Sequence, residues 1–302
     1  MKLFSGSSNM PLAENIAALL GIPLSPLELH VFPDGERRIK LNDVVLEEDA
    51  VVVQPTATPV DQNYMELFFM IDALKRSGAR SVTAVVSYFG YQRQDHIFRD
   101  GEAVSLEVVI TMLESVGTDR VITFDLHSIK IPEMFHIPIV HLSALPRFAQ
   151  KIKEENWVND NTVLVTPDMG GIRRIKILSG LLEDLPFACI VKNRDLVSGT
   201  IKAEEVQGHL KDRAIIVDDM ISSGQTIVEA AKLLFKKGVK EVYVFATHPV
   251  FSEEAPELLD NSGVHKVYVT DTVLIPKEKR FGKLEILTVS SMVSEVLKEK
   301  EI

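Results

Sequence analysis

Two adjacent acids and a loop rich in hydroxyl groups are the residues of this sequence whose types and spacing best suit chemistry. Asp218 and Asp219 follow a β-branched run, Ala214 to Val217, and the loop 220–226 (MISSGQT) leads directly into a predicted helix, Ile227 to Lys237. A strand, a short loop and a helix N-terminus direct free backbone N–H groups and a helix dipole at one point, which suits a phosphate. Carboxylates at the carboxyl end of a strand can accept hydrogen bonds from sugar hydroxyls. The segment therefore predicts a site for a sugar phosphate.

Two commoner phosphate-binding motifs are absent from the sequence. No Gly-Lys-Ser/Thr follows the two acids, so the segment is not a Walker loop, and the dinucleotide fingerprint Gly-x-Gly-x-x-Gly does not occur. For this segment taken alone, the alternative is an ordinary capped helix that follows two solvated acids.

Length and composition limit the classes of protein to which the chain can belong. The chain has 302 residues, of which 46% are hydrophobic and 25% charged, and this is enough for two domains of about 150 residues each. No apolar stretch reaches the ~18 to 20 residues of a membrane helix and the start lacks a signal peptide, so we expect a cytoplasmic protein without a membrane partner. A formal charge of −10 argues against nucleic-acid binding, which needs a basic stripe. The single cysteine, Cys189, lies in an apolar run and predicts a buried thiol.

Short β-branched runs alternate with amphipathic stretches along the whole chain. Strands are predicted at 51–53, 81–86, 120–123, 162–165, 187–191, 214–217, 241–245 and 264–269. Helices are predicted at 65–76, 106–115, 226–237 and 253–259. Several of the strands are apolar on both faces, as strands of a covered parallel sheet are. The pattern therefore predicts an α/β fold with helices on both sides of parallel sheets.

An internal repeat indicates two such units. The first copy consists of 50–55, a helix, 75–82 and Tyr88, and it aligns with 214–219, a helix, 236–242 and His248. Duplication of one α/β unit is the simplest account, although any two strand–helix–strand units share some likeness. We therefore expect an N-terminal domain at residues 1–146 and a C-terminal domain at 147–302, joined without a flexible linker.

The loop 217–226 resembles the phosphoribosyl-binding loop shared by phosphoribosyltransferases and ribose-phosphate diphosphokinases. Four further segments are similar only to the diphosphokinases: Phe32 to Glu36 (FPDGE), Tyr88 to Asp95 (YFGYQRQD), Asp125 to His127 (DLH) and Pro167 to Gly171 (PDMGG). The opening Phe4 to Ser7 agrees as well, so the similarity spans nearly the whole chain. On these motifs the chain is identified as a member of the ribose-phosphate diphosphokinase (phosphoribosyl diphosphate synthetase) family.

The resemblance implies a fold, a reaction and a set of site residues. The fold is two tandem phosphoribosyltransferase-like domains, each a mostly parallel sheet flanked by helices. The reaction transfers the diphosphoryl group of ATP to O1 of ribose 5-phosphate, giving phosphoribosyl diphosphate and AMP, with Mg²⁺ as cofactor. Ribose 5-phosphate would be bound by Asp218, Asp219, Ser222, Ser223, Gly224, Gln225 and Thr226. ATP would be bound by Phe32, Asp34, Glu36, Arg93, Gln94, Asp95 and His127. The metal ligands would be His127 and Asp168, and the catalytic residues Lys192 and Arg194.

The chemistry of these residue types agrees with the implied roles. The planar fork of Arg93 suits the oxygens of a triphosphate. Magnesium prefers oxygen ligands, so Asp168 is a more natural ligand than His127. Diphosphoryl transfer depends on positioning and added positive charge, which Lys192 and Arg194 would supply from a loop that follows the strand ending at Val191. Without the resemblance, residues of these types on loops are more often solvated surface groups.

The resemblance also implies a homo-oligomer built from dimers, a hexamer or a tetramer. In such an assembly Phe32, Asp34 and Glu36 would complete the adenine site of a neighbouring subunit. The alternative is a hairpin whose Phe32 packs into its own domain.

Two other functions are compatible with parts of the sequence. A phosphoribosyltransferase would share the sugar-phosphate loop but would not need Phe32 to Glu36 or a second α/β copy. A non-catalytic regulatory homologue would be expected to lose Lys192, Arg194 or the Asp218 loop, all of which are present. The loop 96–105 also departs from the basic, Pro-containing segment of many bacterial and animal members, which puts regulation and nucleotide preference in doubt more than fold.

Overall fold

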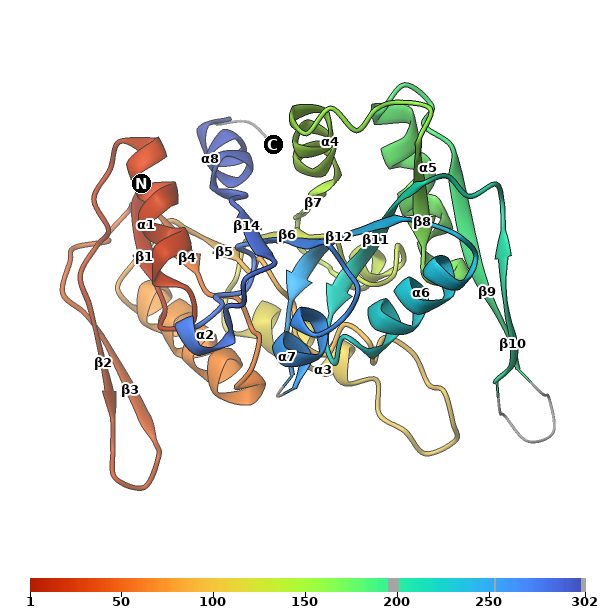
Figure 1. Cartoon of the computed structure of the whole chain (residues 1–302). Helices are drawn as coiled ribbons and strands as arrows, with labels where there is room; N and C mark the ends of the chain where they lie inside the picture. Colours follow the sequence, from red (N-terminus) through yellow and green to blue (C-terminus); the bar gives the residue numbers. More distant parts are fainter. Residues whose placement is uncertain (195–200, 253, 300–302) are drawn as a thin grey trace. The chain divides into compact units, whose positions relative to one another are not determined.

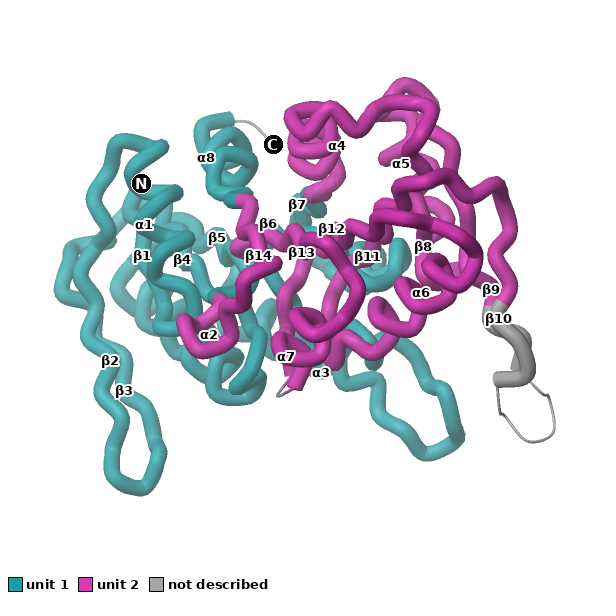
Figure 2. Tube along the Cα trace, in the orientation of Figure 1, with its two compact units in different colours: residues 1–142, 272–274, 288–302 teal, residues 143–271, 275–287 magenta. Residues whose placement is uncertain are grey.

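The computed structural model describes residues 1–194, 201–252 and 254–299, with the side chains of all but 192–194 and 201–204 (Figure 1). The chain divides into two compact units, shown in Figure 2. Unit 1 comprises residues 1–142, 272–274 and 288–302, and unit 2 comprises residues 143–271 and 275–287. Among the described residues, no helix combines the length and the apolar character needed to cross a membrane.

Unit 1 is built on a five-stranded sheet in which every pair of neighbours is parallel. In sheet order the strands are β1 (Lys2–Ser5), β4 (Asp49–Val53), β5 (Ser81–Val85), β6 (Arg120–Phe124) and β7 (Ile139–Leu142). The helices are α1 (Met10–Leu20), α2 (Val60–Arg76), α3 (Ser105–Ser115) and α8 (Ser290–Lys298). One apolar cluster joins α2 and α3 to one face of the sheet, and a second joins α1 and α8 to the other face. Both faces are covered because alternate strand residues are apolar on both sides.

A two-stranded antiparallel ribbon accompanies the sheet of unit 1. Its strands are β2 (Leu27–Val31) and β3 (Arg37–Leu41), and Val31 pairs with Arg37 next to the connecting turn. The ribbon forms a sheet of its own. Leu27, Ile39 and Leu41 pack against the apolar cluster under α2, so the end of the ribbon that is remote from the turn is held by burial.

Unit 2 is built on a seven-stranded sheet that is parallel except at one edge. In sheet order the strands are β10 (Ile201–Gln207), β9 (Phe187–Arg194), β8 (Thr162–Thr166), β11 (Arg213–Ile221), β12 (Glu241–Pro249), β13 (Lys266–Thr270) and β14 (Leu284–Leu287). Only the β10–β9 pair is antiparallel. The helices α4 (Leu145–Glu154) and α5 (Ile172–Leu181) cover one face, and α6 (Gln225–Lys236) and α7 (Ala255–Asp260) cover the other. Three short 3-10 turns complete the described elements, η1 (Ile131–Met134), η2 (Met169–Gly171) and η3 (Lys277–Lys279).

The predicted α/β fold, with helices on both sides of mostly parallel sheets, is confirmed. The repeat suggested by the sequence corresponds to β4–α2–β5 in unit 1 and β11–α6–β12 in unit 2. The last helix, α8, packs beside α1 in unit 1 because Val289 and Val293 join the cluster of Leu12 and Ile16. A division of the chain into functional domains at 1–146 and 147–302 stays a prediction.

Candidate active site

The loop between β11 and α6 has the geometry of an anion site. Gly224 adopts a left-handed backbone (φ 76°) that turns the chain from the loop into the helix at Gln225. Gly224 at the N-cap has no side chain to cap the helix, and the N–H of Gln225 donates to Oγ of Ser223 at 3.4 Å. Ser223, Gln225 and Thr226 are exposed around this N-terminus. The first-turn N–H groups and the helix dipole therefore face solvent where a phosphate could take the place of a cap.

The two acids of this segment lie within β11 and not just after it. The strand continues to Ile221 because Asp218, Met220 and Ile221 keep pairing with β12. On its other side β11 pairs with β8 only as far as Ile216. The side chains of both acids are thus at the carboxyl end of β8, the position where parallel α/β sheets bind ligands.

One arginine contacts both carboxylates. Arg174 on α5 places Nη1 3.4 Å from Oδ1 of Asp218 and Nη2 3.5 Å from Oδ1 of Asp219. The backbone N–H of Asp219 also donates to Oδ1 of Asp218 at 2.9 Å. Burial, followed by the neighbouring charge of Asp219, raises the pKa of Asp218 well above its usual range, and Arg174 opposes this shift only in part. The pair is therefore an acceptor site in which burial and the charge of Asp219 outweigh the attraction of Arg174 on the Asp218 carboxylate.

Asp168 adds a third acid, just after the neighbouring strand. It follows β8, its side chain is exposed, and its Oδ1 accepts the backbone N–H of Gly171 at 3.1 Å. Gly171 has to be a glycine, because a Cβ there would lie 2.1 Å from Oγ1 of Thr166. The negative charge of Asp168 contributes to the raised pKa of Asp218, so the three acids share one electrostatic environment.

The predicted catalytic residues occupy a different element from the one expected. The backbone of Lys192 and Arg194 belongs to β9, where Glu204 pairs with Lys192 and Ile201 with Arg194. The prediction that they lie on a loop after Val191 is wrong, because antiparallel pairing with β10 extends the strand through Arg194. The side chains of both residues lie outside the described part of the structure.

In unit 1 the segment Phe32 to Glu36 forms the turn of the β2–β3 ribbon. The N–H of Phe32 donates to the carbonyl of Glu36, and Gly35 has a positive φ of 93°. Phe32 is 37% exposed, and its ring forms a T-shaped contact with His30. The guanidinium of Arg38 lies over the ring, 5.9 Å from its centroid. Asp34 and Glu36 are exposed beside it. The turn thus presents an aromatic face and two carboxylates to solvent, as the sequence predicted.

The segment that contains Arg93, Gln94 and Asp95 is tied to the segment that contains His127. The connecting residue is Gln92, which is buried and accepts the backbone N–H of His127 at 2.8 Å. His127 itself is exposed just beyond β6. Arg93 and Gln94 are exposed as well, and Asp95 contacts His96 at 2.7 Å. Unit 1 therefore brings two of the three predicted ATP-binding segments together.

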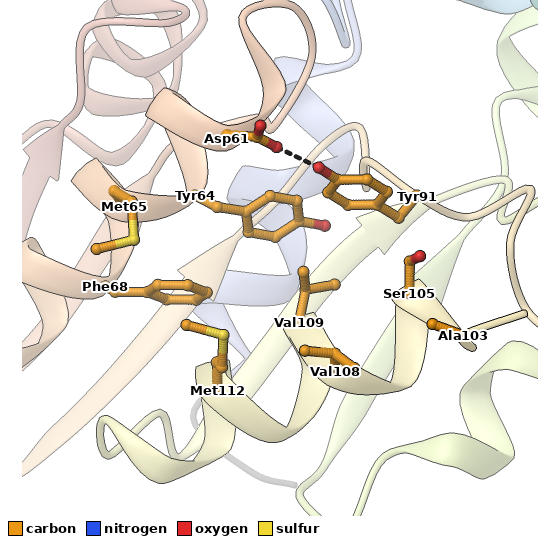
Figure 3. Close-up of a pocket in the computed structure, with 10 residues that line it drawn as sticks. All are labelled: Asp61, Tyr64, Met65, Phe68, Tyr91, Ala103, Ser105, Val108, Val109 and Met112. Atoms are coloured by element: carbon orange, nitrogen blue, oxygen red, sulfur yellow. Dashed lines mark hydrogen bonds between the residues drawn. The ribbon is translucent and has the colours of Figure 1, made fainter.

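An apolar cavity of about 390 Å³ lies beside the Arg93 segment in unit 1 (Figure 3). The hydroxyl of Tyr91 donates to Asp61 at its edge, which together with burial raises the pKa of Tyr91. Tyr91 has a positive φ of 64°, and the N–H of Gln94 donates to its carbonyl at 2.7 Å. The cavity is lined by Asp61, Tyr64, Met65, Phe68, Tyr91, Ala103, Ser105, Val108, Val109 and Met112. Tyr91 thus links this cavity to the turn that presents Arg93.

Two residues of these sites were not found from the sequence. Arg174 lies on a different helix from the acids it contacts, and only the packing of α5 beside β11 brings them together. Glu66 lies on α2 between Met65 and Leu67, and its side chain is fully buried against Ser7 and Arg37. The sequence contained one sign of the role of Glu66: it is an acid on the apolar face of a predicted helix. Such a residue is rarely buried without a partner.

Among the described residues, no three His, Cys, Asp or Glu side chains converge in a way that could hold a metal ion unaided. Magnesium differs from zinc in this respect, since it commonly binds one or two carboxylates together with water and substrate phosphates. The exposed Asp168 carboxylate fits this kind of binding.

The two units with mostly parallel sheets, each flanked by helices, define an α/β protein of the phosphoribosyltransferase-like fold class. Residues 1–117 match the family model described as the N-terminal domain of ribose phosphate pyrophosphokinase, and residues 200–300 match the phosphoribosyl synthetase-associated domain. The chain belongs to the ribose-phosphate pyrophosphokinase family. Ribose-phosphate diphosphokinase is another name for the same enzyme, so the predicted enzyme class is confirmed.

Relatives and a solved structure extend over almost all of the chain. A ribose-phosphate pyrophosphokinase of Gloeobacter violaceus is 39% identical, covering 98% of this chain and 89% of the relative. A ribose-phosphate pyrophosphokinase of Thermotoga maritima is 36% identical, covering 98% of this chain and 94% of the relative. The crystal structure of phosphoribosylpyrophosphate synthetase from Mycobacterium smegmatis superposes with a TM-score of 0.92 at 33% identity, covering 98% of this chain and 97% of that chain.

Proposed function

We propose that the chain transfers the diphosphoryl group of ATP to O1 of ribose 5-phosphate, with the residues of the β11–α6 segment holding the sugar phosphate. The helix start at Gly224, which lacks an N-cap side chain and is joined to the β11 acids by a short loop, is the observation that carries this proposal. Asp218 and Asp219 accept hydrogen bonds from the ribose hydroxyls. Ser222, Ser223, Gly224, Gln225 and Thr226 hold the 5-phosphate through N–H and hydroxyl donors.

ATP is proposed to bind residues of unit 1. Arg93 and Gln94 are exposed for contact with phosphates, and Asp95 and His127 lie with them through the Gln92 link. The exposed Phe32 would stack on adenine while Asp34 and Glu36 accept from its amino group. We propose that this turn serves a neighbouring subunit of a homo-oligomer built from dimers, a hexamer or a tetramer.

Asp168 is proposed to hold Mg²⁺, with His127 contributing less directly because magnesium favours oxygen ligands. When bound, the ion would neutralise part of the charge on the phosphate chain. Asp168 suits this role because its carboxylate is exposed and oriented by Gly171. In this role Asp168 would supply one carboxylate oxygen to the ion at the carboxyl end of β8.

The proposed reaction is an in-line displacement. The bond between O1 and the β-phosphorus forms as the bond from that phosphorus to the α,β-bridging oxygen breaks, AMP leaves, and the hydroxyl proton passes to solvent. Lys192 and Arg194 are proposed to add positive charge to the transition state. No side chain has to act as a strong base. We further propose that the protein works in the cytoplasm and that residues 1–146 and 147–302 are its two functional domains.

The proposal is tested by incubating the purified chain with Mg²⁺, ATP and ribose 5-phosphate and measuring AMP by chromatography. AMP formed only when ribose 5-phosphate is present supports it, and other nucleoside triphosphates and ADP in parallel reactions define the nucleotide preference. A phosphoribosyltransferase or a non-catalytic homologue would form no AMP under these conditions.

A further inference from the structure

A buried ion pair holds the base of the turn that carries Phe32 to Glu36. Oε2 of Glu66 lies 2.6 Å from Nη1 of Arg37, and the Glu66 side chain is fully buried. Nη2 of Arg37 donates to Oε1 of Gln62 at 2.9 Å, one helical turn earlier on α2. Arg37 is the residue directly after the turn, so the guanidinium anchors the ribbon next to its tip.

The same carboxylate also binds the loop after β1. Its Oε1 accepts the backbone N–H of Ser7 at 2.5 Å, and its Oε2 accepts the Ser7 hydroxyl at 2.8 Å. Residues 7, 37 and 66 come from three separate segments of unit 1. One side chain of α2 therefore ties both the start of β3 and the loop after β1 to the helix. The loop after β1 is held in addition by Gly6, which donates its N–H to the carbonyl of Val53, and by Ser8, which donates to Gln54.

The pattern along β3 shows why a charged pair stands here. Residues Arg37, Ile39 and Leu41 are partly buried and alternate with exposed residues, so all three face α2. Ile39 and Leu41 join the apolar cluster, whereas Arg37 is the last inward position before the turn. Apolar contacts tolerate sliding, but two directed hydrogen bonds from a planar guanidinium fix both distance and orientation.

We propose that Glu66 is a positioning residue for nucleotide binding: through Arg37 it fixes the orientation of the Phe32–Glu36 turn. This inference rests on the proposed function, because the turn is proposed there to bind adenine. Glu66 touches no substrate in this scheme. Loss of the pair leaves Phe32 in place on its ribbon but lets the tip move relative to α2.

The experiment compares four variants with the parent chain. Glu66→Gln removes the charge and Arg37→Met removes the anchor while leaving the Ser7 contacts of Glu66. Arg37→Lys keeps a cation at the position. Lys40→Met is the matched control, since Lys40 is an exposed cation on the same strand. AMP formation gives kcat and both KM values, and hydrogen exchange of peptides spanning residues 27–41 reports the ribbon without using activity.

The KM for ATP should rise about tenfold in Glu66→Gln and in Arg37→Met, the size expected for a lost charge-assisted hydrogen bond. The KM for ribose 5-phosphate should stay within about twofold of the parent, since a local positioning effect spares the other substrate. Exchange in 27–41 should be faster in both variants, and Arg37→Lys should recover most of the ATP affinity.

The double variant Arg37→Met/Glu66→Gln makes the test sharper. If the two residues act through one another, the double variant loses no more ATP affinity than the worse single variant. Unchanged KM for ATP in folded Arg37→Met, or equal losses for both substrates, would overturn the inference. If Glu66→Gln does not fold, Arg37→Met and Arg37→Lys decide. A parent chain that forms no AMP refutes the proposed function instead, and the exchange data still show whether the pair holds the ribbon.

Discussion

Nη1 of Arg174 lies 3.4 Å from Oδ1 of Asp218, and each of the two side chains is only 16% exposed. The guanidinium compensates one negative charge, while Asp219 adds a second and Asp168 influences the same carboxylate. In the described part of the chain, this cluster places three acids around the one arginine that contacts Asp218 and Asp219. Sugar hydroxyls, which donate hydrogen bonds, and a divalent cation would relieve the repulsion between these acids, so the arrangement favours the liganded state at some cost in stability.

Asp218→Asn is expected to stabilise the free protein at neutral pH. Burial and the charge of Asp219 raise the folded-state pKa of Asp218, so its contribution to stability is full below the unfolded carboxyl pKa and is lost as pH rises through the raised value. At neutral pH the folded parent must either bury the Asp218 charge or bind a proton that the unfolded chain does not bind, and asparagine avoids both costs. The Tm of the variant should exceed that of the parent by a few degrees at pH 7, and the two should converge near pH 4.

The control for this comparison is Asp212→Asn, a change at an exposed acid paired with Lys240. It should alter Tm little at either pH. The KM for ribose 5-phosphate should rise in Asp218→Asn only. A lower Tm for Asp218→Asn at pH 7 would mean that the ion pair with Arg174 outweighs burial and repulsion.

Arg174→Met tests the other half of the pair. Removing the cation leaves two shielded carboxylates without their shared partner, so the free energy of unfolding should fall by about 3 kcal/mol at pH 7 and by less near pH 4, where carboxyls protonate. The KM for ribose 5-phosphate should rise as well. Arg173→Met is the matched control, because Arg173 is the exposed neighbour on α5. Denaturant unfolding at the two pH values gives the comparison, and equal destabilisation by both variants would refute a specific role for Arg174.

The sequence predicted those features that depend on local pattern. The apolar runs of β4, β5, β6, β8, β11, β12 and β13 are long enough for their alternation to specify buried parallel strands. β1, β7 and β14 have four residues each, and patterns that short do not distinguish a strand from a loop. The extension of β9 through Arg194 depends on pairing with β10, which local pattern does not contain.

Contacts between distant segments were not predictable in the same way. The motif containing Asp218 and Asp219 was evident from its neighbours along the chain, but Arg174 reaches these acids only because α5 packs beside β11. Likewise Glu66, Arg37 and Ser7 meet only through the packing of α2, β3 and the loop after β1. Residues that position other residues contact them only in the folded protein, so a single sequence gives little indication of which residues these are.

Lys192→Ala and Arg194→Ala should lower turnover by orders of magnitude while leaving nucleotide binding nearly intact. Contacts made only in the transition state change kcat and kcat/KM together. Rapid-quench measurement of AMP formation gives the chemical step, and equilibrium dialysis with labelled ATP gives binding. Lys176→Ala, at an exposed position on α5, serves as the surface control. Turnover equal to that of the parent in either variant would refute the proposed role.

Inhibition by ADP at a separate allosteric site is expected to be feeble. The loop after Asp95 exposes Ile97 and Phe98, and Oε2 of Glu102 accepts the N–H groups of both Phe98 and Arg99. This loop has no basic, Pro-containing segment, and basic residues would be needed there to hold a second set of phosphates. Initial rates at varied ATP and ADP should fit competitive inhibition. Strong inhibition that is non-competitive with ATP would contradict this expectation.

The turn containing Phe32 and Glu36 is expected to complete the adenine site of a neighbouring subunit, so that a monomer is inactive. Phe32 is 37% exposed at the tip of the ribbon, and an aromatic face flanked by two carboxylates suits adenine better than solvent. Co-expression of a Phe32→Ala/Glu36→Ala subunit with an Asp219→Ala subunit, each inactive alone, tests this directly. If sites are shared in trans, each mixed dimer regains one intact site, and random mixing restores about a quarter of parental activity. The control combines all three substitutions in one chain and co-expresses it with the Phe32→Ala/Glu36→Ala subunit, which leaves every site damaged. Mixed assemblies that form, as judged by co-purification of two differently tagged subunits, but remain inactive would show that each site is built within one subunit.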